Sequence, residues 1–144
     1  CSNKLFSGTL DIEKPNFEKK VDADVPLTID EAKTISAEQL IKLLHAQKNE
    51  KKSLVLIDAR IKEDRSIAYI ETSISLPDVD TNCQSLQKLI TNFQQQIIIY
   101  CNGIQCGRSL KSVRVAKKCG YTNLYWFRGG IEEWLDKDYP YATE

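Results

Sequence analysis

Short apolar runs alternate along the chain with longer segments in which apolar and polar residues mix. Leu54–Ile57 and Ile97–Tyr100 are continuous apolar runs, of the kind found in parallel strands that are covered on both faces. A further strand is predicted at Leu124–Phe127. Between these runs, apolar residues recur at helical spacing. The pattern therefore predicts strands that alternate with helices.

The helices are predicted from apolar periodicity and from signals at their ends. Ser36 followed by Gln39 is a capping-box signature, and it opens a helix from Ala37 to about Gln47. Leu110–Cys119 is a basic segment that Gly120 ends, as glycine commonly does after the last helical turn. Two further helices are placed by their periodic apolar residues, which are Leu86, Leu89, Ile90 and Phe93 in one and Ile131, Trp134 and Leu135 in the other.

The alternation of strands and helices predicts βα units, right-handed crossovers and a parallel sheet. With 144 residues, the chain is long enough for one domain with a normal core. We divide it into an N-terminal extension, residues 1–32, and a folded domain, residues 33–144. The extension contains two prolines and has a net charge of −3, which is typical of a flexible tether.

The run Ile97–Tyr100 stops at Cys101, and a short glycine-containing loop then leads into the basic segment. A helix N-terminus has partial positive charge and unpaired N–H donors. A thiol that faces it loses its proton more readily. We therefore expect Cys101 to be a nucleophile that handles an anionic group. The alternative is a buried structural cysteine at the end of a strand.

This stretch resembles the active-site loop of the rhodanese-like sulfurtransferases. Val55–Arg60 and Phe127–Trp134 resemble two other motifs of that family, and Ile35–Leu40 resembles the start of such a domain. The motifs occur in the family's order, and the resemblance covers about residues 33–140. It implies a three-layer α/β fold in which helices flank a central parallel sheet of about five strands.

The resemblance implies sulfurtransferase activity. Cys101 would accept a sulfane sulfur from a small anionic donor such as thiosulfate, become a persulfide and pass the sulfur to a thiol acceptor. Gly103 and Gly107 can adopt the positive φ that a cradle of backbone N–H groups needs, and Arg108 would bind an oxyanion of the donor. The expected substrate-binding loop consists of Asn102, Gly103, Ile104, Gln105, Cys106, Gly107 and Arg108.

Asp58 and Arg60 follow an apolar run, and in rhodanese-like domains this pair is chiefly a structural ion pair near the site entrance. The resemblance therefore implies a structural role for both residues. Tyr69 stands where the family has a histidine, in its Gly-His-Ile-Pro-Gly-Ala segment, so the chain is a diverged member at this point. The short strand that follows in the family is retained at Ile74–Leu76.

Six residues separate Cys101 from Arg108, which is a longer loop than typical sulfurtransferases have. A longer loop also resembles the rhodanese-fold phosphatases. The spacing exceeds theirs, however, and Tyr100 rather than a histidine precedes the cysteine. A catalytically inactive rhodanese-like binding domain is a further alternative, which the retained Cys101 opposes.

Cys106 lies five residues after Cys101 in the same loop, close enough to attack a persulfide or sulfenate there. Such a resolving cysteine would make the protein a thiol–disulfide or sulfur-relay redox protein. A packing role under the loop is an equal alternative. Five cysteines do not predict a disulfide framework in a chain of this size, so we expect Cys83 to be unpaired and Cys119 to lie in the core.

The chain has zero net charge, but Thr81 to Ile131 contains no acidic residue and has a net charge of +7. Such a region favours a thiolate and attracts small anions. Nucleic-acid binding is not expected, because interleaved exposed aromatic residues and an overall positive charge are lacking. No apolar run reaches the ~18 residues of a membrane span. No metal site or organic cofactor is predicted, since no cysteine spacing suits zinc and His45 has no histidine partner.

The chain begins at Cys1 and contains no methionine. A chain that begins at cysteine resembles a mature bacterial lipoprotein, in which that residue is lipidated and attaches the protein to a membrane surface. An arbitrary boundary would give the same beginning. The lipoprotein interpretation predicts a periplasmic or cell-envelope location, and a cytoplasmic location is the alternative.

Overall fold

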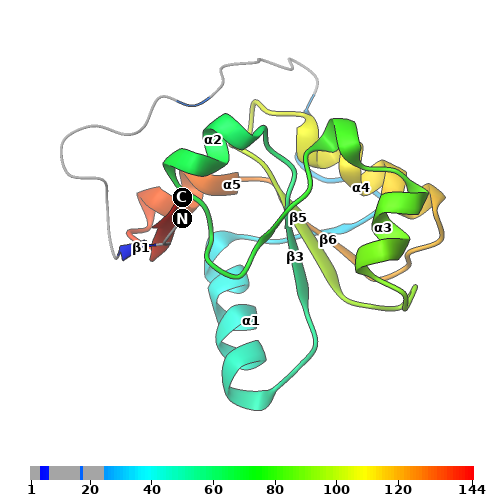
Figure 1. The fold of residues 1–144 in the computed structure, drawn as a ribbon, viewed down its shortest axis with the longest axis horizontal. Helices are drawn as coiled ribbons and strands as arrows, with labels where there is room; N and C mark the ends of the chain where they lie inside the picture. Colours follow the sequence, from blue (N-terminus) through cyan, green and yellow to red (C-terminus); the bar gives the residue numbers. More distant parts are fainter. Residues whose placement is uncertain (1–3, 7–16, 18–24) are drawn as a thin grey trace.

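A computed structural model describes residues 4–6, 17 and 25–144. Its centre is a five-stranded parallel sheet with the strand order β2-β6-β5-β3-β4 (Figure 1). The strands are β2 (Lys33–Thr34), β3 (Val55–Asp58), β4 (Ile74–Ser75), β5 (Ile97–Tyr100) and β6 (Leu124–Phe127). The predicted parallel sheet is therefore confirmed. The ends of β3, β4, β5 and β6 lie within a residue of those expected, whereas β2 was not predicted.

Helices cover both faces of this sheet (Figure 1). They are α1 (Ala37–Glu50), α2 (Lys62–Ile67), α3 (Cys83–Leu89), α4 (Arg108–Lys118) and α5 (Gly130–Asp136), with a short 3₁₀ helix, η1, at Asp78–Asp80. Helices α1 and α5 pack on one face, where Leu40 and Trp134 meet Ile98. Helices α3 and α4 pack on the other, against Ile99. Successive residues of β5 thus enter opposite cores, since strand side chains alternate between faces.

The predicted ends of two helices are present. The Ser36 hydroxyl accepts the N–H of Gln39, and the Gln39 side chain accepts the N–H of Ser36, which completes the capping box. Helix α1 continues to Glu50, three residues beyond the expected end. After α4, Gly120 has a φ of +101°, and the N–H of Tyr121 reaches back to the carbonyl of Ala116 at 3.2 Å. These bonds satisfy carbonyl groups that the helix end leaves unpaired.

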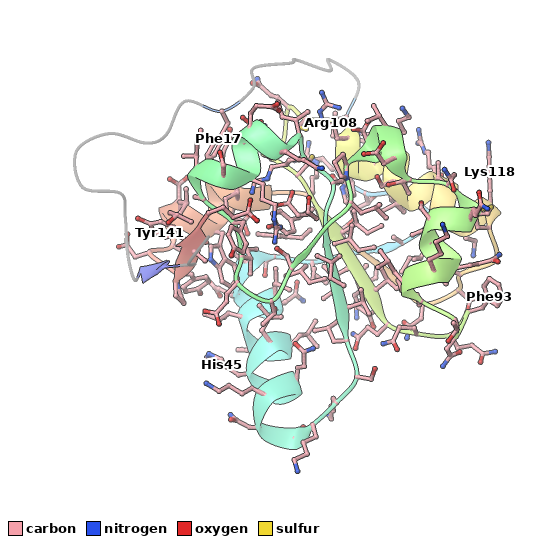
Figure 2. All side chains as sticks on the ribbon, in the orientation of Figure 1. Phe17, His45, Phe93, Arg108, Lys118 and Tyr141 are labelled. Carbon is pink, nitrogen blue, oxygen red and sulfur yellow. A yellow bond between two sulfur atoms is a disulfide. The ribbon has the colours of Figure 1, made fainter. Side chains whose placement is uncertain are left out.

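The third helix is shorter than its apolar periodicity predicted. Helix α3 ends at Leu89, and both Leu89 and Phe93 are more than 40% exposed. Asn92 explains the difference, because its side chain and its carbonyl accept the N–H groups of Gln94 and Gln95 and form a turn instead of another helical turn. Phe93 consequently lies at the edge of the molecule near α3 (Figure 2).

The expectation that Cys83 is unpaired and that Cys119 is a core residue is wrong. The two form a disulfide that joins the first residue of α3 to the residue after α4. The two helices pack on the same face, and this brings the Cα atoms within 5.3 Å, a distance that suits a disulfide. The sequence separation of 36 concealed this proximity.

Described residues of the N-terminal extension contact the folded domain. Strand β1 (Lys4–Phe6) pairs with the C-terminal strand β7 (Tyr141–Thr143) in an antiparallel ladder. Phe17 is buried in the core, and Arg128 donates a hydrogen bond of 2.6 Å to the carbonyl of Pro26. Cys1 lies outside the described residues, so its lipidation stays a prediction. In the part of the chain that is described, no helix is long and apolar enough to cross a membrane.

Candidate active site

Cys101 lies immediately after β5, the middle strand of the sheet, at the edge where the parallel strands end. All four residues of β5 are fully buried, so the strand gives the cysteine a fixed position. The N-terminus of α5 holds the following loop from the other side, since the N–H groups of Ile131 and Glu132 donate to the carbonyls of Cys101 and Asn102 at 3.0 and 2.9 Å. The loop is therefore held between a core strand and a helix end.

Gly130 permits this close approach. Its φ is +60°, which L residues with side chains rarely adopt, and a Cβ atom there would collide with the carbonyl oxygen of Cys101. Gly103 and Gly107, expected to have positive φ, do not, and the φ of Gly107 is −90°. The loop turns without them because the N–H of Cys106 donates to the carbonyl of Gly103 at 3.0 Å, closing a turn of ordinary backbone conformation.

The sulfur of Cys101 lies at the N-terminus of α4, as the sequence predicted. Its side chain is hydrogen-bonded to the Ser109 hydroxyl at 3.1 Å and to the backbone N–H of Ser109. The thiol also donates a hydrogen bond of 3.2 Å to the carbonyl oxygen of Cys106, and the Cys106 sulfur lies within hydrogen-bonding reach of it. The hydroxyl and the N–H of Ser109 therefore favour the thiolate of Cys101, while the contact with Cys106 favours the protonated thiol.

We expected Cys101 to be the readily ionised thiol, but its pKa is raised and that of Cys106 is lowered. Burial and the hydrogen bond to Cys106 raise the pKa of Cys101 well above its ordinary value. The hydrogen bond from Cys101, together with the backbone N–H groups of Arg108 and Asn102, lowers the pKa of Cys106 to about 7. The loop amides thus surround the second cysteine, and the pair shares one proton near neutral pH.

The other predicted loop residues occupy different environments. Asn102 is buried, and its amide donates to Asp64 in α2 at 2.9 Å. Ile104 and Gln105 form the exposed tip of the loop. Arg108 begins α4 (Figure 2) and forms an ion pair of 2.6 Å with Asp78 of η1. The predicted donor-binding guanidinium is thus held beside the loop by a carboxylate.

Asp58 and Arg60 form a fully buried, bidentate ion pair at the end of β3, with N–O distances of 3.0 and 2.9 Å. Arg65 and the Tyr100 hydroxyl also bond to the Asp58 carboxylate. Although burial opposes ionisation, the charge of Arg60 lowers the pKa of Asp58. The network links β3 to the residue that precedes Cys101, so it supports the base of the loop.

Sequence reasoning missed Ser109, Asp64, Asp78 and Arg65. Ser109 directly follows the expected substrate-binding loop, and a serine in the first turn of a helix that faces a thiol is the signal that could have identified it. Asp64, Asp78 and Arg65 belong to segments distant from Cys101 in the chain, and only the fold brings them to the site.

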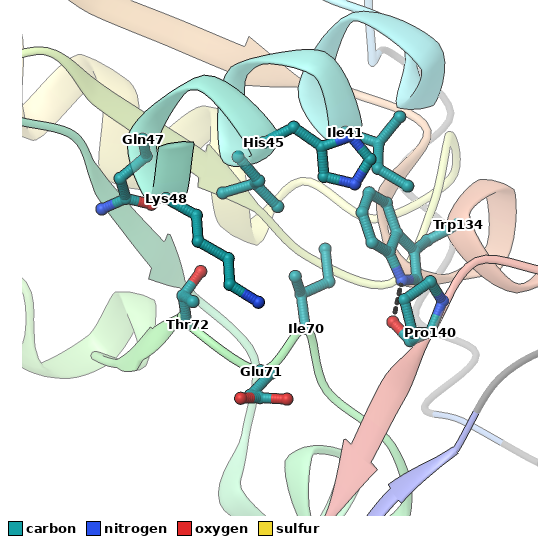
Figure 3. A pocket seen from close by; sticks show the side chains of 10 residues that line it. Ile41, His45, Gln47, Lys48, Ile70, Glu71, Thr72, Trp134 and Pro140 are labelled. Atoms are coloured by element: carbon teal, nitrogen blue, oxygen red, sulfur yellow. Dashed lines mark hydrogen bonds between the residues drawn. The ribbon is translucent and has the colours of Figure 1, made fainter. Parts of the chain in front are cut away.

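His45 is not part of this site. It lines a separate cavity of about 460 Å³ between α1 and the turn before β4, together with Ile70 and Trp134 (Figure 3). None of the residues of the Cys101 loop lines that cavity. Within the described ranges, no group of three or more His, Cys, Asp or Glu side chains is arranged to hold a metal ion.

Comparison with known families decides the assignment of the fold. The family described as Rhodanese-like domain matches residues 36–137, which include both the buried ion pair and the Cys101 loop. The chain belongs to the rhodanese-like domain family. In this rhodanese-like domain, Cys101 occupies the strand end at which the family resemblance placed the reactive cysteine.

An uncharacterized protein of Buchnera aphidicola is 33% identical to this chain over 95 residues, which are 64% of this chain and 63% of that protein. The chain thus spans less than two thirds of that relative. A human single-domain sulfurtransferase matches with a TM-score of 0.59 at 22% identity, over 74% of this chain and 97% of its own. Thiosulfate sulfurtransferase from Pseudomonas aeruginosa matches with a TM-score of 0.58 at 22% identity, and the match covers 76% of this chain and 20% of that protein. Both structures share the fold of this rhodanese-like domain.

Proposed function

We propose that the protein is a sulfurtransferase that moves a sulfane sulfur from a small anionic donor, such as thiosulfate, through a persulfide on Cys101 to a thiol acceptor. The proposal rests on one observation above all. Cys101 lies buried at the end of the central strand, with the hydroxyl and N–H of Ser109 directed at its sulfur. The rhodanese-like family and its sulfurtransferase neighbours support the same class of reaction.

The first step requires the thiolate of Cys101. Its proton passes to Cys106 along their hydrogen bond, and the Ser109 hydroxyl and N–H then stabilise the negative sulfur. The thiolate attacks the sulfane sulfur of thiosulfate, a new S–S bond forms, and sulfite leaves with the electron pair of the broken bond. Cys101 is now a persulfide.

The second step returns the cysteine to its starting state. A thiolate of the acceptor attacks the outer sulfur of the persulfide and becomes a persulfide itself. Cys101 leaves as the thiolate, which Ser109 again stabilises. No electrons are gained or lost overall, because the sulfane sulfur only changes its carrier.

Positive charge near the loop favours the anionic donor. Arg108 and Lys111 lie on the first turn of α4, 2.6 and 3.6 Å from the carboxylate of Asp78. Two further carboxylates lie at the loop, since Asp64 accepts from Asn102 and Glu132 lies against Gly103. The donor would therefore be bound by the Arg108 guanidinium and the N-terminus of α4 rather than by a net positive field.

We propose a location in an oxidising compartment such as the periplasm or cell envelope. The disulfide between Cys83 and Cys119 supports this location, since disulfides that join secondary-structure elements persist mainly outside reducing cytosol. The expected partners are then the small sulfur donor and a thiol acceptor present in that compartment.

The test is intact-protein mass spectrometry after incubation with thiosulfate. The wild-type chain, Cys101→Ser and the control variant Cys1→Ser are incubated with thiosulfate, and the mass of the added sulfur is measured. A thiol acceptor is then added, and the released sulfite and the transferred sulfur are measured. Cys101→Ser is expected to abolish both products, because it removes the only sulfur carrier in the mechanism. Undiminished sulfur transfer by Cys101→Ser would overturn the proposal.

A further inference from the structure

Cys101 and Cys106 are the two free cysteines of the described chain, and they are in contact with one another. The turn that joins Cys106 to Gly103 folds the loop back on itself, so that the Cys101 thiol meets both the carbonyl and the sulfur of Cys106. A cysteine with only a packing role would not need to place its sulfur beside the Cys101 sulfur. A cysteine that attacks a persulfide on Cys101 must have its sulfur there.

The surroundings of Cys106 favour its ionised form. Its sulfur accepts hydrogen bonds from the Cys101 thiol and from the backbone N–H groups of Arg108 and Asn102. The guanidinium of Arg108 adds positive charge. These contacts lower the pKa of Cys106 to about 7, so a thiolate is present at neutral pH. The loop amides therefore stabilise a second nucleophile within reach of the first.

Access to the pair is from the side of Cys106. Cys101 is 1% exposed, Cys106 is 6% exposed, and the next residues toward the tip, Ile104 and Gln105, are open to solvent. A thiol that arrives from solution meets Cys106 before Cys101. This order suits a disulfide that forms inside the loop and is reduced from outside.

We propose that Cys101 and Cys106 form a redox-active dithiol that releases the bound sulfane sulfur as hydrosulfide, and that the resulting disulfide is then reduced by a dithiol. This proposal rests on the proposed function, because it requires the Cys101 persulfide as its intermediate. The outer sulfur of that persulfide is released as hydrosulfide instead of being transferred to an acceptor thiol. The protein would then be a sulfane-sulfur reductase when no acceptor thiol competes.

The steps balance in atoms and charge. The dithiol begins with one proton and one negative charge. Cys101 attacks thiosulfate as described above, and sulfite leaves while Cys106 holds the proton. The Cys106 sulfur then attacks the inner sulfur of the persulfide, a Cys101–Cys106 disulfide forms, and the outer sulfur leaves as hydrosulfide with that proton. Two cysteine sulfurs have lost two electrons in total, and the sulfane sulfur has gained them.

The disulfide is reduced by ordinary thiol–disulfide exchange. One thiolate of an external dithiol attacks the more accessible Cys106 sulfur, and Cys101 leaves as a thiolate, which takes the proton of the second thiol of the reductant. The second thiol of the reductant resolves the mixed disulfide and releases Cys106. The dithiol thereby supplies the two electrons that convert the sulfane sulfur to hydrosulfide.

The experiment compares the wild-type chain, Cys106→Ser and Cys101→Ser in a single turnover with thiosulfate. The proteins are first reduced with dithiothreitol and desalted. Sulfite and hydrosulfide are quantified, the intact mass is measured, and disulfide-linked peptides are mapped so that Cys101–Cys106 is distinguished from Cys83–Cys119.

We expect the wild-type chain to release both sulfite and hydrosulfide and to finish with a Cys101–Cys106 disulfide and no added sulfur. Cys106→Ser should take up sulfur more slowly, because Cys106 no longer accepts the Cys101 proton. It should nevertheless retain one added sulfur atom and release at least about tenfold less hydrosulfide for each persulfide formed. Sulfur uptake, even at a reduced rate, shows that the variant is folded. Cys101→Ser should give neither product.

Other results would overturn the proposal in distinguishable ways. A wild-type chain that retains the added sulfur and releases no more hydrosulfide than Cys106→Ser would refute the dithiol while leaving the proposed sulfurtransferase intact. Sulfur uptake by neither protein would refute the proposed function itself. A disulfide in the wild-type chain without sulfur on Cys106→Ser would show that Cys106, and not Cys101, receives the sulfur.

Discussion

The indole N–H of Trp126 donates a hydrogen bond of 2.8 Å to the Ser109 hydroxyl, and both groups are buried. The Ser109 hydroxyl also forms a hydrogen bond of 3.1 Å with the Cys101 sulfur, and it is the donor when Cys101 is a thiolate. The Cys101 thiol in turn contacts Cys106. Trp126, Ser109, Cys101 and Cys106 thus form one connected hydrogen-bond network.

Ser109→Ala should slow the formation of the Cys101 persulfide by about tenfold, because the nucleophile loses one charge-assisted hydrogen bond. The measurement is the rate of sulfite release from thiosulfate. Ser112→Ala is the matched control, since Ser112 is buried in the same helix and its hydroxyl makes no hydrogen bond in the described part of the chain. Equal rates in the two variants would argue against a role for the Ser109 hydroxyl.

Cys101→Ala should raise the pKa of Cys106 from about 7, since the hydrogen bond from Cys101 is the largest cause of its depression. Only the thiolate reacts with iodoacetamide, so at pH 7 the alkylation of Cys106 should become slower and its pH midpoint should move upward. Cys101→Ser retains a hydroxyl donor and should change the midpoint less. An identical midpoint in wild type and Cys101→Ala would mean that the loop amides alone determine the ionisation of Cys106.

Asp58→Asn should destabilise the fold by about 3–5 kcal/mol, because the two buried cations that it serves, Arg60 and Arg65, lose their counter-charge. Urea unfolding followed by tryptophan fluorescence measures the change. Glu31→Gln, which breaks the exposed pair with Arg114, is the control and should have little effect. Equal losses in the two variants would contradict the role of burial.

The same carboxylate predicts the pH dependence of stability. The pKa of Asp58 is lowered from its ordinary value of 3.8 in the folded state, so its contribution is fully present above that value. The contribution should be lost as the pH falls through the lower, folded pKa. The free energy of unfolding of the wild-type chain should therefore fall more steeply in acid than that of Asp58→Asn.

Gly130→Ala should destabilise the protein more than Gly120→Ala. Both glycines have positive φ, but a Cβ at position 130 would collide with the Cys101 carbonyl and lie 2.7 Å from the Asn102 carbonyl carbon. At position 120 the nearest atom is a Phe93 ring carbon at 3.5 Å, an ordinary contact. We expect about 1 kcal/mol for Gly120→Ala and a larger loss, with slower sulfur transfer, for Gly130→Ala. Equal melting temperatures would contradict this expectation.

The double variant Cys83→Ser, Cys119→Ser should lose about 3 kcal/mol of stability, because the disulfide restricts a loop with a sequence separation of 36 residues in the unfolded chain. Its persulfide formation below the melting temperature should match that of the wild type, since both cysteines lie away from the Cys101 loop. Thermal unfolding with and without a reductant provides the measurement. A reductant that lowers the melting temperature of the double variant as much as that of the wild type would contradict this explanation.

Local patterns were sufficient for most of the fold. Continuous apolar runs predicted β3, β5 and β6, because a strand covered on both faces needs apolar residues at every position. The capping box at Ser36 and the glycine at position 120 predicted helix ends, since those signals act within one turn of the chain. The end of α3 was missed because Asn92 forms a local turn that competes with helical periodicity.

The sequence by itself determined the order of strands and helices, the family and the position of Cys101, because each depends on residues that are neighbours in the chain. Only the tertiary structure decided which cysteine is ionised, that Cys83 pairs with Cys119, and that Arg108 meets Asp78. Burial, disulfide distance and ion pairing depend on which surfaces the packed sheet and helices bring together. The ionisation state of the Cys101–Cys106 pair therefore depends on how the loop packs, and the spacing of the two cysteines in the sequence does not predict it.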